Sequence, residues 1–257
     1  METGIKNITD PGKKQQNEIV VEIKDIKKSF GSNEVLKDIS FNLIKGENLV
    51  VLGKSGSGKS VLIKCIVALL EPDEGDIIVF GKDIFSLKNK ELNLMRKKIG
   101  FLFQSGALYD SMSVRENLAF PLRDSKGISK DEINKLIEEA LEDVGLADTI
   151  DKMPSELSGG MRKRLGLART LILKPEIILY DEPTTGLDPI TSKEISELIL
   201  KVQKEHNTTS VIITHDIACA KLTANRIIVF KDGVISTEGT FEELEKSEDE
   251  WVRSFFE

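Results

Sequence analysis

Residues 53–60 of the chain are Gly53-Lys54-Ser55-Gly56-Ser57-Gly58-Lys59-Ser60, and they match the pattern G-x-x-x-x-G-K-[ST] at every fixed position. An apolar run over 47–52 precedes this stretch and another over 61–70 follows it, which predicts a strand, a loop and a helix. Glycines let backbone N–H groups turn toward an anion, and the helix N-terminus adds unpaired donors. The sequence therefore predicts a cradle for a nucleoside triphosphate, with Lys59 on the outer phosphates and Ser60 on Mg²⁺.

A flexible linker rich in glycine and serine is the alternative explanation of this stretch. A linker requires neither the Lys59-Ser60 pair at the entrance of a helix nor an apolar strand immediately before it. The flanking elements therefore favour the phosphate cradle, and all eight residues of the loop are candidates for nucleotide binding.

The composition limits the possible classes of protein. With 257 residues, of which 40% are hydrophobic, the chain is long enough for an α/β domain with its own core. Its formal net charge of −7 argues against nucleic acid as a partner, because proteins that bind the phosphate backbone carry a dense basic face. Residues 1–17 are polar and lack the apolar segment of a signal peptide, so we expect a flexible tail, one domain over 18–257 and a cytoplasmic location.

The sequence contains neither a membrane-spanning run nor a pair of neighbouring cysteines. No apolar run approaches the ~18 residues that span a bilayer, so any membrane association is expected to come through a partner. Cys65 and Cys219 are isolated within apolar helical patterns, far from a second cysteine or a histidine cluster. We expect both cysteines to be small core residues.

The segment before the phosphate cradle predicts a β-subdomain. Apolar and polar residues alternate over 19–23 and 39–43, which is typical of antiparallel strands with one buried face. Phe30 comes just before a Gly-Ser-Asn turn in this segment. An aromatic ring there either stacks on an adenine or packs against the sheet, and the spacing leaves both interpretations open.

A further buried strand is predicted over 99–103, and it stops at Gln104. Ligands bind at the carboxyl ends of strands in open α/β sheets, so Gln104 is a candidate for contacting Mg²⁺ and the attacking water. Glutamine also occurs at strand ends without such a role. Residues 105–172 include a predicted helix over 129–144, and we interpret them as an inserted α-helical subdomain.

Another predicted helix begins at Ser158-Gly159-Gly160 and continues with three basic residues at 162–164. Ser158 can cap this helix, and the glycines leave backbone donors uncovered by side chains. The helix start is a second candidate anion site. The alternative is an ordinary capped helix with a basic, solvated face.

Two more apolar strands end in residues suited to hydrolysis. The run 177–180 leads to Asp181, which can hold Mg²⁺, and to Glu182, which can deprotonate the water that attacks a γ-phosphate. The run 209–214 leads to His215, a candidate donor to the γ-phosphate, whereas His206 is expected to be solvated. A surface turn at 181–183 and a structural histidine are the alternatives, and the neighbouring motifs disfavour them.

These motifs together resemble, in order and spacing, the motif set of ATP-binding-cassette (ABC) transporter ATPases. The resemblance covers about residues 19–240 and also includes Leu187-Asp188. It implies a P-loop NTPase core of ABC ATPase type that binds ATP and Mg²⁺. It implies that Phe30 stacks on adenine, that Ser158 to Met161 contact the ATP of a second copy, and that Asp188 lies at the interface of this homodimer.

A finer resemblance lies in residues 103–112, in Ala119-Phe120-Pro121-Leu122 and in Asp188-Pro189-Ile190-Thr191. These stretches look like the ATPase of Mla/MCE-type phospholipid transport systems. An ABC importer ATPase for amino acids, peptides or another small solute is the alternative. Less favoured are an ABC ATPase that acts outside transport, which typically carries a coiled-coil insertion or duplicated cassettes, and a P-loop kinase, which needs an acceptor site and a lid.

The resemblance also implies a transmembrane permease as partner, at the cytoplasmic face of the inner membrane. Residues 104–122 combine apolar Leu108, Tyr109 and Met112 with sparse charge, which suits a docked permease helix, although internal packing is the alternative. The aromatic residues in the last stretch, 251–256, are expected to pack the final helix.

Overall fold

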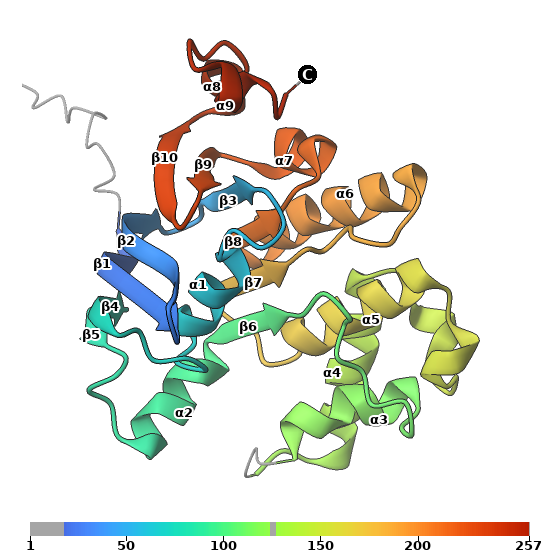
Figure 1. Cartoon of the computed structure of the whole chain (residues 1–257). Helices are drawn as coiled ribbons and strands as arrows, with labels where there is room; N and C mark the ends of the chain where they lie inside the picture. The colour runs from blue at the N-terminus through green and yellow to red at the C-terminus, as the bar shows by residue number, and fades with distance from the viewer. Residues whose placement is uncertain (1–17, 124–126, 257) are drawn as a thin grey trace, which may run out of the picture.

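The computed structural model of the chain describes residues 18–123 and 127–256, and Figure 1 shows their arrangement. The flexible tail expected over 1–17 lies outside these residues. Within the described part, a ten-stranded mixed sheet has this strand order: β5 (Lys82–Asp83), β4 (Glu74–Val79), β1 (Ile19–Phe30), β2 (Asn33–Ile44), β10 (Val234–Gly239), β9 (Arg226–Lys231), β3 (Asn48–Gly53), β8 (Thr209–Thr214), β7 (Ile177–Asp181) and β6 (Ile99–Leu102).

The sheet has an antiparallel part and a parallel part. Strands β5, β4, β1 and β2 pair antiparallel, as the alternating pattern at the start of the chain predicts. Strands β9, β3, β8, β7 and β6 pair parallel, and β10 joins the two parts because it pairs with both β9 and β2. Strands β9 and β10 have no counterpart among the strands expected from the sequence.

The helices are α1 (Lys59–Ile66), α2 (Asn89–Lys97), α3 (Val114–Ala119), α4 (Lys130–Asp143), α5 (Gly159–Leu171), α6 (Pro189–His206), α7 (Ile217–Thr223), α8 (Phe241–Glu245) and α9 (Glu250–Arg253), with 3₁₀ turns at Phe120–Leu122, Ala147–Thr149 and Pro154–Glu156. Helices α3, α4 and α5 follow one another between β6 and β7, and Figure 1 shows them as a group beside the sheet. This is the segment that we interpret as an inserted helical subdomain.

The parallel strands are buried on both faces. Val50 and Leu52 of β3 belong to one hydrophobic cluster, which includes residues of α4, α5 and α6. Leu49 and Val51 of the same strand belong to the other cluster, which includes α1 and the antiparallel strands. Successive side chains of a strand point to opposite faces, so a continuous apolar run is required for a strand with two covered faces.

Helix α1 is shorter than the apolar run 61–70 predicts. It ends at Ile66, and Ala68 has a φ of 53°, a left-handed conformation that cannot continue an α-helix. Arg96 of α2 donates to the carbonyl oxygens of Val67 and Ala68, at 3.0 and 2.8 Å. A contact from a distant helix thus stabilises the end of α1, and hydrophobicity alone does not place it.

No helix over residues 18–123 and 127–256 is long and apolar enough to cross a membrane.

Candidate functional site

The ends of the parallel strands surround one cavity of about 880 Å³. Because β3, β8, β7 and β6 are neighbours and parallel, the loops that follow them meet at one edge of the sheet. The lining includes the following residues predicted from the sequence: Phe30, Gly53, Lys54, Ser55, Gly56, Gly58, Lys59, Ser60, Gln104, Glu182 and His215. The structure therefore brings together candidates that are far apart along the chain.

The loop between β3 and α1 needs its glycines. Gly56 and Gly58 have φ values of 81° and 101°, which side chains disfavour, and a Cβ on Gly53 would lie 2.7 Å from the carbonyl oxygen of Phe230. The buried Lys59 donates from Nζ to the carbonyl oxygens of Gly53 and Lys54, at 2.7 and 2.9 Å. Burial lowers the pKa of Lys59, while the nearby carboxylates oppose that shift.

A hydroxyl and a carboxylate meet at the start of α1. We call residues 53–60, the cradle predicted from the sequence, the phosphate loop. Ser60 donates from Oγ to Oδ1 of Asp181 at 3.0 Å, which joins this loop to the end of β7. Burial raises the pKa of Asp181, the hydrogen bond from Ser60 opposes that shift, and the adjacent Glu182 adds to it. Mg²⁺ prefers oxygen ligands and keeps several waters, so this pair fits the cation.

Glu182 lies directly after β7 and has a φ of 51°, an uncommon backbone conformation for a glutamate. Its carboxylate accepts a hydrogen bond from Thr185 Oγ1 at 3.0 Å, and its Oε2 lies 2.7 Å from Nδ1 of His215. Only 13% of the Glu182 side chain is exposed, compared with 58% for His215. The unusual backbone geometry therefore places an acceptor at the cavity wall, where a water molecule can reach it.

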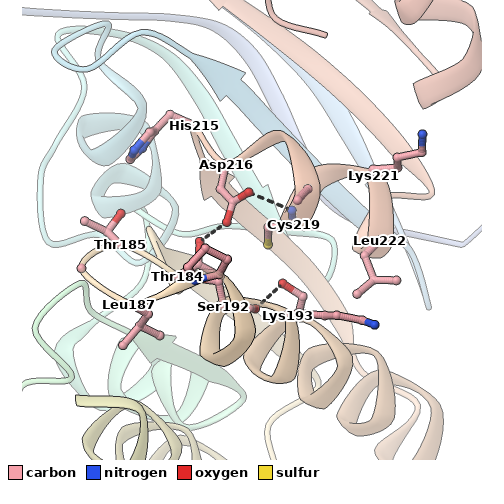
Figure 2. Close-up of a pocket in the computed structure, with 14 residues that line it drawn as sticks. Thr184, Thr185, Leu187, Ser192, Lys193, His215, Asp216, Cys219, Lys221 and Leu222 are labelled. Carbon is pink, nitrogen blue, oxygen red and sulfur yellow. Dashed lines mark hydrogen bonds between the residues drawn. The ribbon is translucent and has the colours of Figure 1, made fainter. Parts of the chain in front are cut away.

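A second cavity, of about 820 Å³, adjoins the first one, and Thr185 and His215 line both. Figure 2 shows how Asp216 connects the two walls of this second cavity: it accepts from Thr184 Oγ1 at 2.9 Å and from the backbone N–H of Cys219 at 3.1 Å. Because Asp216 is the next residue after His215, these bonds fix the backbone that carries the imidazole.

The start of α5 lies outside the first cavity, which we call the nucleotide cavity because the sequence predicts ATP binding by its lining. Ser158 is exposed and caps the helix by accepting from the backbone N–H of Met161 at 3.2 Å, as one interpretation of the sequence expects. A Cβ on Gly160 would lie 2.5 Å from Cγ2 of Thr191, so this glycine permits close contact with the start of α6. Asp188 caps α6 through the backbone N–H groups of residues 190 and 191. The hydrogen bond from the Thr191 hydroxyl, at 2.6 Å, and then these backbone hydrogen bonds lower the pKa of Asp188.

Lys163 was not among the candidates from the sequence, which assigned residues 162–164 to a possible solvated face. The structure buries this side chain, and its Nζ donates to the carbonyl oxygen of Gln104 and to that of Glu182, the latter at 3.3 Å. Burial lowers its pKa, against the attraction of two carboxylates. Helical spacing was the available signal, because Lys163 falls on the same face of α5 as the buried Gly160 and Leu167.

We expect Lys163→Met to slow ATP hydrolysis by about 10- to 100-fold, the range produced by small displacements of catalytic groups. The substitution removes the one ammonium that joins α5 to the backbones of Gln104 and Glu182. Phosphate release and ATP affinity are measured side by side, with Lys204→Met, an exposed lysine on α6, as the matched control. A Lys163→Met variant with parental turnover contradicts this positioning role.

Comparisons with known proteins agree with the motif analysis. A sequence profile of the family described as ABC transporter matches residues 36–185. The probable ribonucleotide transport ATP-binding protein mkl of Mycobacterium leprae is 41% identical over 92% of this chain and 68% of its own length. The intermembrane phospholipid transport system ATP-binding protein MlaF of Haemophilus influenzae is 38% identical over 93% of this chain and 90% of its own length.

Two further matches bear on cargo and assembly. The methionine import ATP-binding protein MetN of Clostridium acetobutylicum is 40% identical over 88% of this chain and 70% of its own length. A solved dimeric structure of the ATP-binding cassette MJ0796, in a post-hydrolysis state bound to ADP and Pi, is 35% identical with a TM-score of 0.78, over 86% of this chain and 98% of that one. The chain spans about two thirds of the length of the mycobacterial relatives that it matches.

Proposed function

This chain belongs to the ABC transporter family, whose members bind and hydrolyse ATP, and on that premise we propose that it drives phospholipid transport together with an Mla/MCE-type membrane permease. The observation that carries the ATPase part is the single cavity that contains the phosphate loop, Gln104, Glu182 and His215. We place the chain at the cytoplasmic face of the cell membrane, held there by the permease.

In the proposed mechanism the phosphate loop and Lys59 bind the triphosphate of ATP. Ser60, Asp181 and Gln104 would hold Mg²⁺, and the cation would supply positive charge to the phosphates. Glu182 takes the proton of the water whose oxygen bonds to the γ-phosphorus. The bond between the γ-phosphorus and the β,γ-bridging oxygen breaks, so ADP leaves with that oxygen and inorganic phosphate is the second product. His215 holds Glu182 through Nδ1, and when protonated it also donates from Nε2 to the γ-phosphate.

The likeness to MlaF, the ATP-binding protein of an intermembrane phospholipid transport system, supports phospholipid as the cargo. The match extends over 93% of this chain and 90% of MlaF. MetN, a methionine import ATP-binding protein, has a slightly higher identity, 40%, over 88% of this chain and 70% of its own length. An importer ATPase for a small solute is therefore the second candidate, and the identity to MetN is the observation that favours it.

The surface that we propose for the permease follows Gln104. Tyr109 is 41% exposed, contacts the ring of Phe120 in a tilted arrangement with 4.6 Å between the centroids, and lies near the guanidinium of Arg169. Leu108 packs against the core instead, so the apolar surface is smaller than the sequence indicates. We call the remaining residues, Tyr109, Met112 and Phe120, the docking patch.

Asn117 fixes the shape of the docking patch. Its buried amide donates to the carbonyl oxygens of Tyr109, Met112 and Ser113 at 2.9 to 3.1 Å, and it accepts from the backbone N–H of Tyr109 at 2.9 Å. One side chain therefore holds the loop that begins a few residues after Gln104. A permease helix seated on this loop is positioned to sense changes around Gln104.

Tyr109→Asp combined with Met112→Asp is expected to abolish co-purification with the permease and to leave the ATP affinity of the isolated chain unchanged. The two carboxylates place charge on an apolar contact, whereas neither residue lines the nucleotide cavity. Leu94→Asp, an exposed leucine on α2, is the control and should retain the permease. Retention of the permease by the double variant contradicts the docking patch.

The same complex tests the cargo. In reconstituted vesicles, labelled phospholipid should move only when ATP is present. Movement of an amino acid or peptide with no movement of lipid overturns the phospholipid assignment and leaves the ATPase assignment intact. A phosphorylated small molecule in place of free phosphate would instead indicate a kinase.

A further inference from the structure

The segment that follows α9 reaches the nucleotide cavity. Ser254 and Phe255 line the same cavity as Phe30 and the phosphate loop, although they lie more than 190 residues from that loop in sequence. The aromatic residues of this stretch were expected to pack only the last helix. Phe255 does pack on the last helix, α9, through Trp251, but it also lines the cavity. Phe256 instead contacts Phe241 of α8 edge-on at 5.0 Å.

The contacts around Phe255 hold it in place. Val252 is 1% exposed and belongs to a hydrophobic core cluster, which fixes α9 against the domain. Phe255 contacts the ring of Trp251 edge-on at 4.8 Å, and the ammonium of Lys231 lies 4.3 Å from the Trp251 ring centre. Lys231 ends β9, and β9 pairs with β3, the strand that leads into the phosphate loop. The position of Phe255 is therefore tied to the sheet that carries the cradle.

The cavity is lined by two kinds of residue, one charged or polar and the other apolar. Lys59, Ser60, Gln104 and Glu182 provide the charged and polar groups that suit a triphosphate and its cation. The apolar side chains of the lining are those of Phe30, Val35, Val61, Ile217 and Phe255. A nucleoside has apolar ring faces and gains affinity from aromatic contact, whereas a phosphate chain does not.

We propose that Phe255 contacts the nucleoside part of bound ATP and forms, with Phe30, a second aromatic wall of the binding site. The inference rests on the proposed ATP-binding function, and it assigns to the C-terminal segment a role in nucleotide affinity. Ser254, the residue before Phe255, lines the same cavity, so the segment that follows α9 forms part of the site.

The test compares two ligands that share a phosphate chain. Phe255→Ala should weaken ATP binding by about 3- to 10-fold, the range of one aromatic contact, and should leave the affinity for inorganic tripolyphosphate unchanged. Both affinities are measured by calorimetry on the full chain with Mg²⁺. Phe256→Ala removes the neighbouring ring that packs on Phe241, and it should bind both ligands as the parent does.

Phe255→Leu keeps most of the apolar volume of the side chain, so it provides a second test if the alanine variant does not fold. It should bind tripolyphosphate as the parent does and weaken ATP binding less than Phe255→Ala. Equal ATP affinity of the parent, the leucine and the alanine variants overturns the inference, and so does an equal loss for ATP and tripolyphosphate. Failure of the parent itself to bind ATP would instead overturn the proposed function.

Discussion

Glu182→Gln is expected to keep ATP binding and to slow hydrolysis by roughly 10²- to 10⁴-fold, the usual contribution of a positioned general base. Glutamine has the shape of glutamate, so the contacts with Thr185 and His215 at 3.0 and 2.7 Å can be replaced by amide contacts. An amide cannot take the proton of the attacking water. The loss should therefore appear in the rate of phosphate release and not in the dissociation constant for ATP.

Two variants control this result. Glu138→Gln changes an exposed glutamate on α4 and should hydrolyse ATP at the parental rate. Lys59→Ala should have the opposite signature and lose the nucleotide, because it removes both a phosphate contact and the hydrogen bonds that close the loop on Gly53 and Lys54. A Glu182→Gln variant that turns over ATP like the parent shows that another group is the base.

Much of the nucleotide cavity can be predicted from short stretches of the sequence. Gly53 to Ser60, Gln104, Glu182 and His215 each come directly after an apolar run, and parallel strands bring such positions to one edge. The buried cysteines are equally local: Cys65 and Cys219 lie in apolar patterns, and burial raises the pKa of each thiol to about 11. For these residues, the pattern of neighbouring apolar residues was sufficient to predict their position.

Other residues of the site depend on contacts between distant segments. Lys163 lies in a basic stretch that is typical of solvent exposure. Its buried ammonium is stabilised by the carbonyl oxygens of Gln104 and Glu182, which come together only because the segments after β6 and β7 are neighbours in the fold. Phe255 lines the cavity because Val252 and Trp251 pack on the domain. His206 is exposed, as expected, yet its Nε2 lies 3.0 Å from Asp143 of α4. Local periodicity contains no information on such partners.

The start of α5 favours a role between two copies of the chain. The nucleotide cavity of the same chain is not lined by Ser158, Gly159 or Asp188. Ser158 and Gly159 nevertheless lie at the start of α5, where backbone N–H groups of a helix can bind an anion. A Cβ on Gly159 would lie 3.5 Å from Leu187, so the starts of α5 and α6 form one surface, on which Ile190 is 75% exposed. A second copy could present its own bound ATP to this surface, where the helix start offers donors to a phosphate.

With Mg²⁺ and ATP, the Glu182→Gln variant should therefore sediment as a dimer, and addition of Ser158→Arg should return it to a monomer. Arginine adds bulk and a positive charge where the partner's phosphates would approach the helix. Ser158→Ala removes only the cap on Met161, worth about 1 kcal/mol, and separates loss of the cap from steric exclusion. Ser236→Arg on β10 is the matched control and should leave the dimer intact. At protein concentrations low enough to keep every variant monomeric, ATP affinity should be the same in all of them, because Ser158 and Ser236 lie outside the nucleotide cavity of their own chain. A dimer that persists with Ser158→Arg would refute this role, since an arginine at the contact leaves no room for the partner's nucleotide.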